Sequence, residues 1–335
     1  MNRFLACGVA SSELDDGERR LLRELAPGGV LLFARNVASR EQLSALVAEL
    51  RALPGPPLLG VDLEGGRVNR LRAVIGPLPS AAEAAAAGVE ACQALGEAAG
   101  AACAYFGIDL DLAPVLDVAW PGGWLAGEGR CFGGDAAGVT SLAGAFLAGL
   151  ERYGVRGCLK HYPGLGSGAV DSHRELPVLG DEVREEERVF QALATPQRAV
   201  MVAHALCPQL GEGFAPASLS AAVVGRLAGV RCGLVLADDL EMGALAGWGG
   251  LEERAAAALA AGCDQVILSN VLEKRVPLAA YVNRAAAGDT HLAARLQRGK
   301  ERFGAFRSSV ALRPVSWSEV ERAAEAARRL AGGAV

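Results

Sequence analysis

The sequence predicts an α/β protein with a (β/α)8 TIM-type barrel, built as a single domain over residues 1–335. Two observations carry this prediction: eight short apolar runs alternate with longer helical stretches, and polar residues follow directly after several of the runs. The length fits two average domains, but α/β barrels often use such a length as one. A doubly wound open sheet is the alternative, although the first run lacks the G-x-G-x-x-G turn of dinucleotide-binding folds.

The eight expected strands are near-continuous apolar runs, as parallel strands covered on both faces require. They are Phe4–Val9, Gly29–Phe33, Leu58–Asp62, Asp109–Pro114, Gly157–His161, Ala199–His204, Leu234–Asp238 and Gln265–Ser269. The first run contains Cys7 and could be mistaken for a lipoprotein signal. It is too short for the apolar segment of such a signal, and acidic residues follow at once, so we expect a strand.

Helices are expected between the strands. In Arg40–Ala52, apolar residues recur at helical spacing at Leu43, Leu46, Val47 and Leu50. The other expected helices are Ala81–Tyr105, Gly138–Tyr153, Glu182–Ala194, Leu251–Ala261 and a final amphipathic helix within Ser316–Val335.

Composition narrows the class of protein. Hydrophobic residues make up 51% of the chain and the mean hydropathy is +0.25, yet no uninterrupted apolar stretch is long enough for a membrane span. The net charge of −5 and a pI near 5.6 argue against a nucleic-acid partner. Eight scattered cysteines without a CxxC pair indicate buried thiols in a reducing compartment, not disulfides or zinc ligands. We therefore expect a cytoplasmic protein.

Polar residues stand where the expected strands end. These are Asp62, Asp117, Lys160 with His161, His204, and Asp238 with Asp239. Barrel enzymes build their sites at the carboxyl ends of the strands, so these side chains should meet at one rim.

The segment from Lys160 to His173 is the richest in chemistry. The chain has only three lysines and four histidines, and one lysine and two of the histidines fall in these 14 residues. Pro163 and three glycines make the segment a loop with unusual backbone freedom. Asp171 stands two residues before His173, so its carboxylate could orient and charge the imidazole of a general acid/base.

Three further segments supply carboxylates and cations. Asp238 at a strand end could act as a nucleophile, a metal ligand or a base, while Asp239 could cap the next helix. Asp62 is followed by a Gly pair and by Arg70; such groups can bind hydroxyl or carboxylate oxygens, or form a salt-bridged loop. Arg130 lies in a glycine-rich loop and is a weak signal alone.

The spacing Lys-His-x-Pro-Gly-x-Gly, four residues, then Asp-Ser-His resembles the signature of glycoside hydrolase family 3, in particular its single-domain bacterial β-N-acetylglucosaminidases of peptidoglycan recycling. The resemblance covers most of the chain. Its further segments, in the same order, are 28–36, 62–70, 112–118, the Arg130 loop, 200–204, 238–240 and 261–264.

The resemblance implies a role for each matching position. Asp238 matches the nucleophile, His173 the general acid/base and Asp171 its supporting carboxylate. The sugar-binding positions match Asp62, Arg70, Arg130, Lys160 and His161. A retaining double displacement on terminal β-linked GlcNAc would follow, with GlcNAc-1,6-anhydro-MurNAc or its peptides as the substrate. No cofactor or metal is implied, and a monomer is expected.

Three positions depart from the family pattern. Leu165 stands where a second His is usual, Ala237 where Ser precedes the nucleophile, and Gly129 where an acidic residue is common. None removes a group that the resemblance makes catalytic. Three alternatives stay open: a β-glucosidase or β-xylosidase of the same family, a phosphorylase using the same covalent intermediate, and a catalytically silent sugar-binding barrel.

Overall fold

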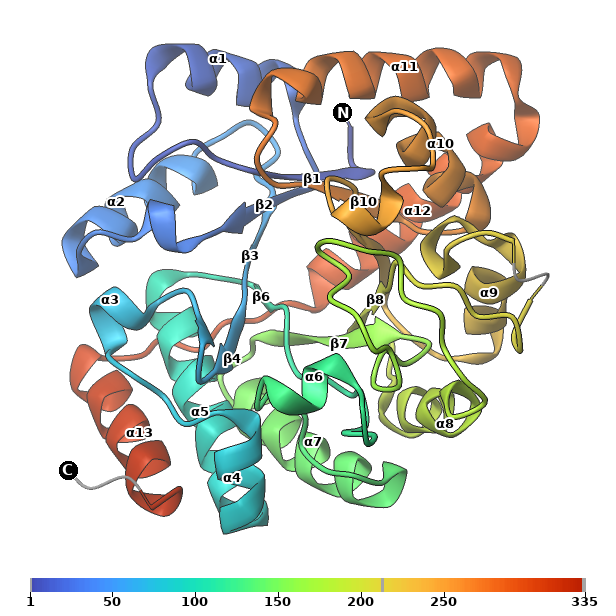
Figure 1. Ribbon diagram of the computed structural model, residues 1–335. Helices are drawn as coiled ribbons and strands as arrows, with labels where there is room; N and C mark the ends of the chain where they lie inside the picture. The colour runs from blue at the N-terminus through green and yellow to red at the C-terminus, as the bar shows by residue number, and fades with distance from the viewer. Residues whose placement is uncertain (1, 212–213, 333–335) are drawn as a thin grey trace.

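Eight parallel strands close into a barrel in the computed structural model, which describes residues 2–211 and 214–332 (Figure 1). Around the barrel the order is β1-β2-β3-β6-β7-β8-β9-β10, and β10 pairs with β1 to complete the ring. The strands are β1 (Leu5–Gly8), β2 (Gly29–Leu32), β3 (Leu58–Val61), β6 (Leu110–Asp111), β7 (Arg156–Tyr162), β8 (Ala199–Val202), β9 (Leu234–Asp239) and β10 (Gln265–Leu268). The barrel prediction is confirmed, and closure excludes the open sheet.

Every predicted strand is present, and β6 differs most in length. It was expected to span six residues, but only Leu110–Asp111 pair regularly. Pro114 lacks an amide hydrogen, so the regular ladder cannot continue through it. The segment nevertheless stays beside β7, because the carbonyls of Ala113 and Pro114 accept from the amides of Cys158 and Lys160.

Helices surround the barrel (Figure 1). The longer ones are α1 (Asp16–Leu25), α2 (Arg40–Arg51), α5 (Val89–Phe106), α7 (Ala136–Glu151), α8 (Val183–Leu193), α10 (Leu251–Ala261), α11 (Arg275–Gly288), α12 (Thr290–Ser309) and α13 (Trp317–Leu330). Shorter pieces are α3 (Arg72–Ile75), α4 (Ala81–Ala87), α6 (Trp124–Gly127) and α9 (Ala221–Gly225), with a hairpin of β4 (Leu63–Gly65) and β5 (Val68–Asn69). No helix in the described ranges is long and apolar enough to cross a membrane.

The sequence itself marks several helix starts. The side chains of Ser39, Ser80 and Asp135 each accept the amide hydrogen three residues on and so satisfy a free donor at the start of α2, α4 and α7. One prediction was wrong: Ala81–Tyr105 is two helices, not one. Gly88 between them has φ +103°, far from helical values, so the chain turns there and restarts as α5.

Two apolar layers hold the barrel. The inner layer contains side chains that point into it from the strands, among them Leu31, Leu58, Met201 and Ile267. A larger cluster joins the outer strand faces to the helices. Because the strands are buried on both faces, their sequences are mostly apolar and lack the alternation of half-exposed strands.

The α12 helix closes the amino-terminal end of the barrel. Its Phe303 and Phe306 belong to the inner apolar layer. Two arginines near its carboxyl end also donate hydrogen bonds to segments that precede strands. Arg302 donates to the carbonyl of Cys232 before β9, and Arg307 donates to the carbonyl of Pro56 before β3. With this end filled, open space in the barrel remains at the carboxyl ends of the strands.

Helices α5 and α7 approach each other through glycine. A Cβ atom on Gly149 would lie 2.2 Å from the carbonyl oxygen of Gln93, and one on Gly96 would lie 2.0 Å from that of Phe146. Real Cβ atoms do not come this close to backbone oxygen, so both positions require glycine for the two helices to touch.

Gly149→Ala should therefore destabilise the barrel. The added methyl must push α7 away from α5, and such overpacking lowers the free energy of unfolding by about 1–3 kcal/mol. Gly144→Ala on the same helix is the matched control, because its nearest new neighbour would be Leu193 at an ordinary 3.5 Å. Chemical denaturation should show the control unchanged or up to about 1 kcal/mol more stable. Equal stability of the two variants would contradict this helix contact.

Candidate active site

A pocket of about 390 Å³ opens at the carboxyl ends of the barrel strands. All eight residues predicted from the sequence line it: Asp62, Arg70, Arg130, Lys160, His161, Asp171, His173 and Asp238. They come from four regions: the end of β3 and its hairpin, the loop before α7, the end of β7 with its following loop, and the end of β9. The barrel thus brings together residues up to 176 positions apart in the chain.

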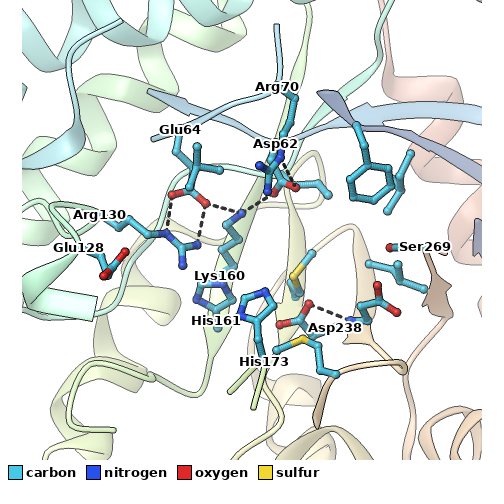
Figure 2. A pocket seen from close by; sticks show the side chains of 18 of the residues that line it. Asp62, Glu64, Arg70, Glu128, Arg130, Lys160, His161, His173, Asp238 and Ser269 are labelled. Carbon is cyan, nitrogen blue, oxygen red and sulfur yellow. Dashed lines mark hydrogen bonds and ion pairs between the residues drawn. The ribbon is translucent and has the colours of Figure 1, made fainter. Parts of the chain in front are cut away.

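One wall of the pocket is a cluster of paired charges. The Nζ atom of Lys160 lies 2.7 Å from Asp62 Oδ1 and 2.7 Å from Glu64 Oε1. Arg130 donates two hydrogen bonds of 2.8 Å to the two oxygens of Glu64. Arg70 Nε lies 3.9 Å from Asp62 Oδ2. Figure 2 shows these five side chains gathered on one side of the pocket.

Burial and charge act in opposite directions on this cluster. Burial would lower the pKa of Lys160, but the carboxylates of Asp62 and Glu64 raise it above its ordinary value. Burial would likewise raise the pKa of Glu64, but the positive charges of Lys160 and Arg130 hold that pKa well below its ordinary value. Lys160, Glu64 and Arg130 therefore stay charged at neutral pH. They offer fixed donors and acceptors to a polyhydroxylated ligand.

Asp238 lies across the pocket from this wall. Its Oδ1 accepts the amide hydrogen of Asp239 at 2.8 Å. Burial would raise the pKa of Asp238, but its electrostatic interactions with His161 and His204 and the hydrogen bond from the Asp239 amide lower that pKa below its ordinary value. The carboxylate is therefore ionised at neutral pH, as nucleophilic attack or cation stabilisation requires.

Three of the four histidines influence Asp238, namely His161, His173 and His204. His204 is fully buried just after β8; its Nδ1 lies 2.7 Å from Ser218 Oγ and its Nε2 lies 3.0 Å from the carbonyl oxygen of Asp239. A carbonyl only accepts, so Nε2 carries the hydrogen and Nδ1 accepts from Ser218. His204 thereby fixes the backbone beside Asp238. The sequence placed His204 at a strand end but assigned it no role.

His173 lies on the loop after β7 and is paired with Asp171. Its Nδ1 is 2.9 Å from Asp171 Oδ1, which also accepts the His173 amide at 3.0 Å. The side chain of His173 is 66% exposed, whereas that of Asp171 is 21% exposed. The loop is attached to the segment after β9, where Gly243 donates to the carbonyl of His173. An exposed imidazole with a carboxylate on one nitrogen can exchange protons with solvent and ligand.

Asp117 contacts both the ring and the backbone amide of His161. The Nδ1 atom of His161 lies 2.6 Å from Asp117 Oδ2, and the His161 amide lies 3.2 Å from Asp117 Oδ1. Figure 2 shows His161 and His173 between the Lys160 cluster and Asp238. The sequence noted Asp117 at a strand end, yet neither Asp117 nor Glu64 was among the predicted site residues. Glu64 could have been found from its place two residues after Asp62.

The remaining wall of the pocket is largely apolar. Leu31, Phe33, Met201, Met242 and Ile267 line it together with Asp239 and Ser269. Burial raises the pKa of the Asp239 carboxyl to about 6, while the Ser269 hydroxyl and the Glu241 amide oppose that rise by bonding to it. One side of the pocket is therefore charged and the opposite side can receive carbon surface.

The three departures from the family pattern leave these groups in place. Leu165 is buried in the apolar core, where its amide donates to Asp117, and Ala237 is buried within β9. Gly129 has φ +68°, a conformation that favours glycine, and precedes Arg130. Within the described residues no group of three or more His, Cys, Asp or Glu side chains could hold a metal ion.

Comparison with known proteins agrees with this geometry. Residues 6–300 match the model of the glycosyl hydrolase family 3 N terminal domain. A β-hexosaminidase of Chromobacterium violaceum is 38% identical over 312 residues, which cover 88% of this chain and 86% of that protein.

Two solved structures extend the comparison. NagZ from Neisseria gonorrhoeae, solved with N-trifluoroacetyl-D-glucosamine, superimposes with a TM-score of 0.76 at 28% identity over 99% of this chain and 98% of its own. A family 3 β-N-acetylglucosaminidase from Paenibacillus gives 0.85 at 28% identity, covering 98% of this chain and 67% of its own. The barrel, its pocket and these matches place the chain among the glycoside hydrolases, as a member of glycosyl hydrolase family 3.

Proposed function

We propose that this protein is a retaining exo-β-N-acetylglucosaminidase. The observation that carries the proposal is one pocket holding an ionised carboxylate, Asp238, and an exposed imidazole paired with a carboxylate, His173 with Asp171. The charged wall beside them suits sugar hydroxyls. The names of the similar proteins, β-hexosaminidase and NagZ, support N-acetylhexosamine as the sugar.

The first step forms a covalent glycosyl-enzyme. Asp238 attacks the anomeric carbon of the terminal sugar, and the bond from that carbon to the leaving oxygen breaks. His173, protonated and oriented by Asp171, gives its proton to the leaving oxygen, so the aglycone departs as an alcohol. Asp62, Arg70, Arg130, Lys160 and His161 hold the sugar hydroxyls so that the anomeric carbon lies over Asp238.

The second step releases the sugar. His173, now neutral, takes a proton from a water molecule as the oxygen attacks the anomeric carbon and the bond to Asp238 breaks. Two displacements at one carbon restore its configuration, so the product is first formed as the β anomer. Most retaining glycosidases divide this chemistry between two carboxylates. Here an imidazole takes the acid/base role, so the usual carboxylate-separation rule does not apply.

The natural substrate that we propose is GlcNAc-1,6-anhydro-MurNAc, free or carrying a peptide, in cytoplasmic cell-wall recycling. The protein would act as a monomer without metal or cofactor. This finer assignment rests on the resemblance of the sequence and on the name NagZ of a similar structure.

A panel of aryl β-glycosides tests the sugar preference. The N-acetylglucosaminide should be hydrolysed with a kcat/KM at least tenfold above those of the glucoside and xyloside. Proton NMR of the reaction should show the β anomer first, and phosphate should not change the product. Faster hydrolysis of the glucoside or xyloside would indicate a β-glucosidase or β-xylosidase instead. Formation of a sugar phosphate in the presence of phosphate would indicate a phosphorylase, and binding without turnover would indicate a silent sugar-binding barrel.

Asp238→Ala should abolish turnover of the same N-acetylglucosaminide, because no covalent intermediate can form. The matched control is Asp289→Asn, which alters an acidic residue that caps α12 away from the pocket. It should keep wild-type kcat, and both variants should unfold at similar temperatures. Near-wild-type activity of Asp238→Ala would rule out the nucleophile assignment.

His173→Ala should lose activity according to the leaving group. Glycosides of alkyl alcohols need protonation of the leaving oxygen and should slow by about 10²–10⁴-fold, whereas a dinitrophenyl glycoside should form the intermediate at nearly the normal rate. The control is His291→Ala, which removes the exposed histidine of α12 outside the pocket. Steady-state and burst kinetics on both substrates provide the measurement. A uniform loss on both substrates would mean that His173 does not act as the acid.

A further inference from the structure

A tight turn over residues 171–175 holds His173 against Asp171. The Asp171 carbonyl accepts the amides of Arg174 at 2.9 Å and Glu175 at 3.0 Å, while Asp171 Oδ1 contacts the amide and the ring of His173. All of these bonds lie within the turn, so they fix the imidazole relative to its own carboxylate. Placing the turn relative to Asp238 requires contacts with another part of the chain.

Those contacts are made with the segment that follows β9. The Gly243 amide donates to the His173 carbonyl at 2.9 Å, and the Ala244 amide donates to the Ser172 carbonyl at 3.2 Å. We call these two bonds the loop junction. Gly243 stands five positions after Asp238 in the chain. The junction therefore connects the turn that carries His173 to the same stretch of chain that carries Asp238.

The segment after β9 is the fixed side of the loop junction. Leu240 and Leu245 are fully buried, and Ala244 is also buried. The Leu240 amide donates to the carbonyl of Ile267 in β10 at 3.1 Å. The His173 side chain, in contrast, is exposed. The amides of the buried segment thus determine where the exposed turn lies, and not the reverse.

Glycine is required at position 243 because the turn approaches so closely. A Cβ atom on Gly243 would lie 2.6 Å from the carbonyl oxygen of Arg174 and 2.7 Å from that of His173. Real Cβ atoms do not come this close to backbone oxygen. Gly243 is not among the glycines with a positive φ, so its own backbone would accept alanine. Only the approach of the turn demands glycine there.

We propose that Gly243 is a positioning residue for the acid/base: it lets the His173 turn dock on the segment after β9, and so places the imidazole in the pocket that Asp238 lines (Figure 2). The effect on the rate rests on the proposed function, whereas the docking does not. Because backbone atoms alone make the loop junction, no side-chain chemistry marks it in the sequence.

Other bonds hold the loop on either side of the turn. Before the turn, the carbonyl of Gly168 accepts the amide of Trp124 at 2.8 Å, and after it the carbonyl of Pro177 accepts the amide of Leu206 at 2.8 Å. Neither bond involves residues 171–175. Loss of the loop junction should therefore release the His173 turn while the rest of the loop and the barrel stay folded.

Gly243→Ala should release the turn. The buried segment cannot yield, so the added methyl group pushes the exposed turn away and the amides of residues 243 and 244 lose their acceptors. Hydrogen–deuterium exchange measured by mass spectrometry should be at least about tenfold faster in peptides that cover 171–175 and 243–244.

Gly247→Ala is the matched control for the exchange measurement. Gly247 lies on the same segment, it also lacks a positive φ, and a Cβ atom there would meet nothing within 4 Å. Exchange in this variant should match the wild type. Equal exchange in the two variants, whether fast or slow, would overturn the proposal.

The kinetic loss in Gly243→Ala should depend on the leaving group. Turnover of an alkyl N-acetylglucosaminide should fall by about 10–100-fold, because the acid is displaced from the leaving oxygen. The burst from a dinitrophenyl N-acetylglucosaminide should keep nearly its normal rate, since that leaving group departs without a proton. A merely structural disturbance of the pocket would slow both substrates equally, and such a result would overturn the positioning role.

Combining Gly243→Ala with His173→Ala tests whether the effect passes through the imidazole. Once the ring is absent its position no longer matters, so Gly243→Ala should cause no further loss in the His173→Ala background. Losses that multiply in the double variant would mean that Gly243 acts on something other than His173, which would overturn the proposal.

Wild-type exchange separates this inference from the proposed function, because it needs no substrate. Slow exchange at residues 243–244 in a protein that hydrolyses none of the glycosides would overturn the proposed function and leave the docking in place. Exchange there at the rate of free amides in an active enzyme would overturn the docking and leave the function. If Gly243→Ala does not fold, this wild-type measurement decides alone.

Discussion

A buried lysine ammonium is the interaction on which the site depends. Lys160 is 2% exposed, and a charge so far from water is tolerated only with partners that compensate the lost hydration. Asp62 and Glu64 are those partners, and they tie the end of β7 to the chain after β3. Two carboxylates around one ammonium would leave excess negative charge, which Arg130 balances through its two bonds to Glu64. The requirement for neutrality thus organises one wall of the pocket from three separate segments.

The sequence was informative where chemistry and periodicity coincide. The eight strands are buried on both faces and mostly apolar, so each could be located as a run, and polar residues at the run ends identified the rim. The single helix expected over Ala81–Tyr105 failed because an alanine-rich pattern continues through Gly88, and only its positive φ breaks the helix. Asp117 and Glu64 were not placed in the site because their importance lies in contacts with His161, Lys160 and Arg130, residues distant in the chain. The sequence offered a local signal for Glu64, two residues after Asp62, but none for the pairing of Asp117 with His161, which the closed barrel creates.

The two sides of the pocket suit different parts of a ligand. Charged groups already bonded to one another need little rearrangement to bind hydroxyls, which is the preorganisation that electrostatic catalysis requires. The opposite wall, with Phe33, Met201 and Met242, offers carbon surface and flexible thioethers. Asp238 is partly buried between them, whereas His173 reaches the same space from an exposed loop. Asp238, the proposed nucleophile, thus lies on a barrel strand, whereas His173, the proposed acid/base, lies on a loop.

The closure of the barrel by α12 has a consequence for biosynthesis. Phe303 and Phe306 fill the inner layer that strands from β1 onward surround, yet they follow β1 by almost 300 residues in the chain. During synthesis β1 leaves the ribosome almost 300 residues before Phe303 and Phe306 do. Until then the nascent barrel has an unfilled apolar interior at its amino-terminal end, which chaperones that recognise exposed apolar surface can bind. The stability gained by filling this end of the barrel therefore comes only after α12 has been synthesised.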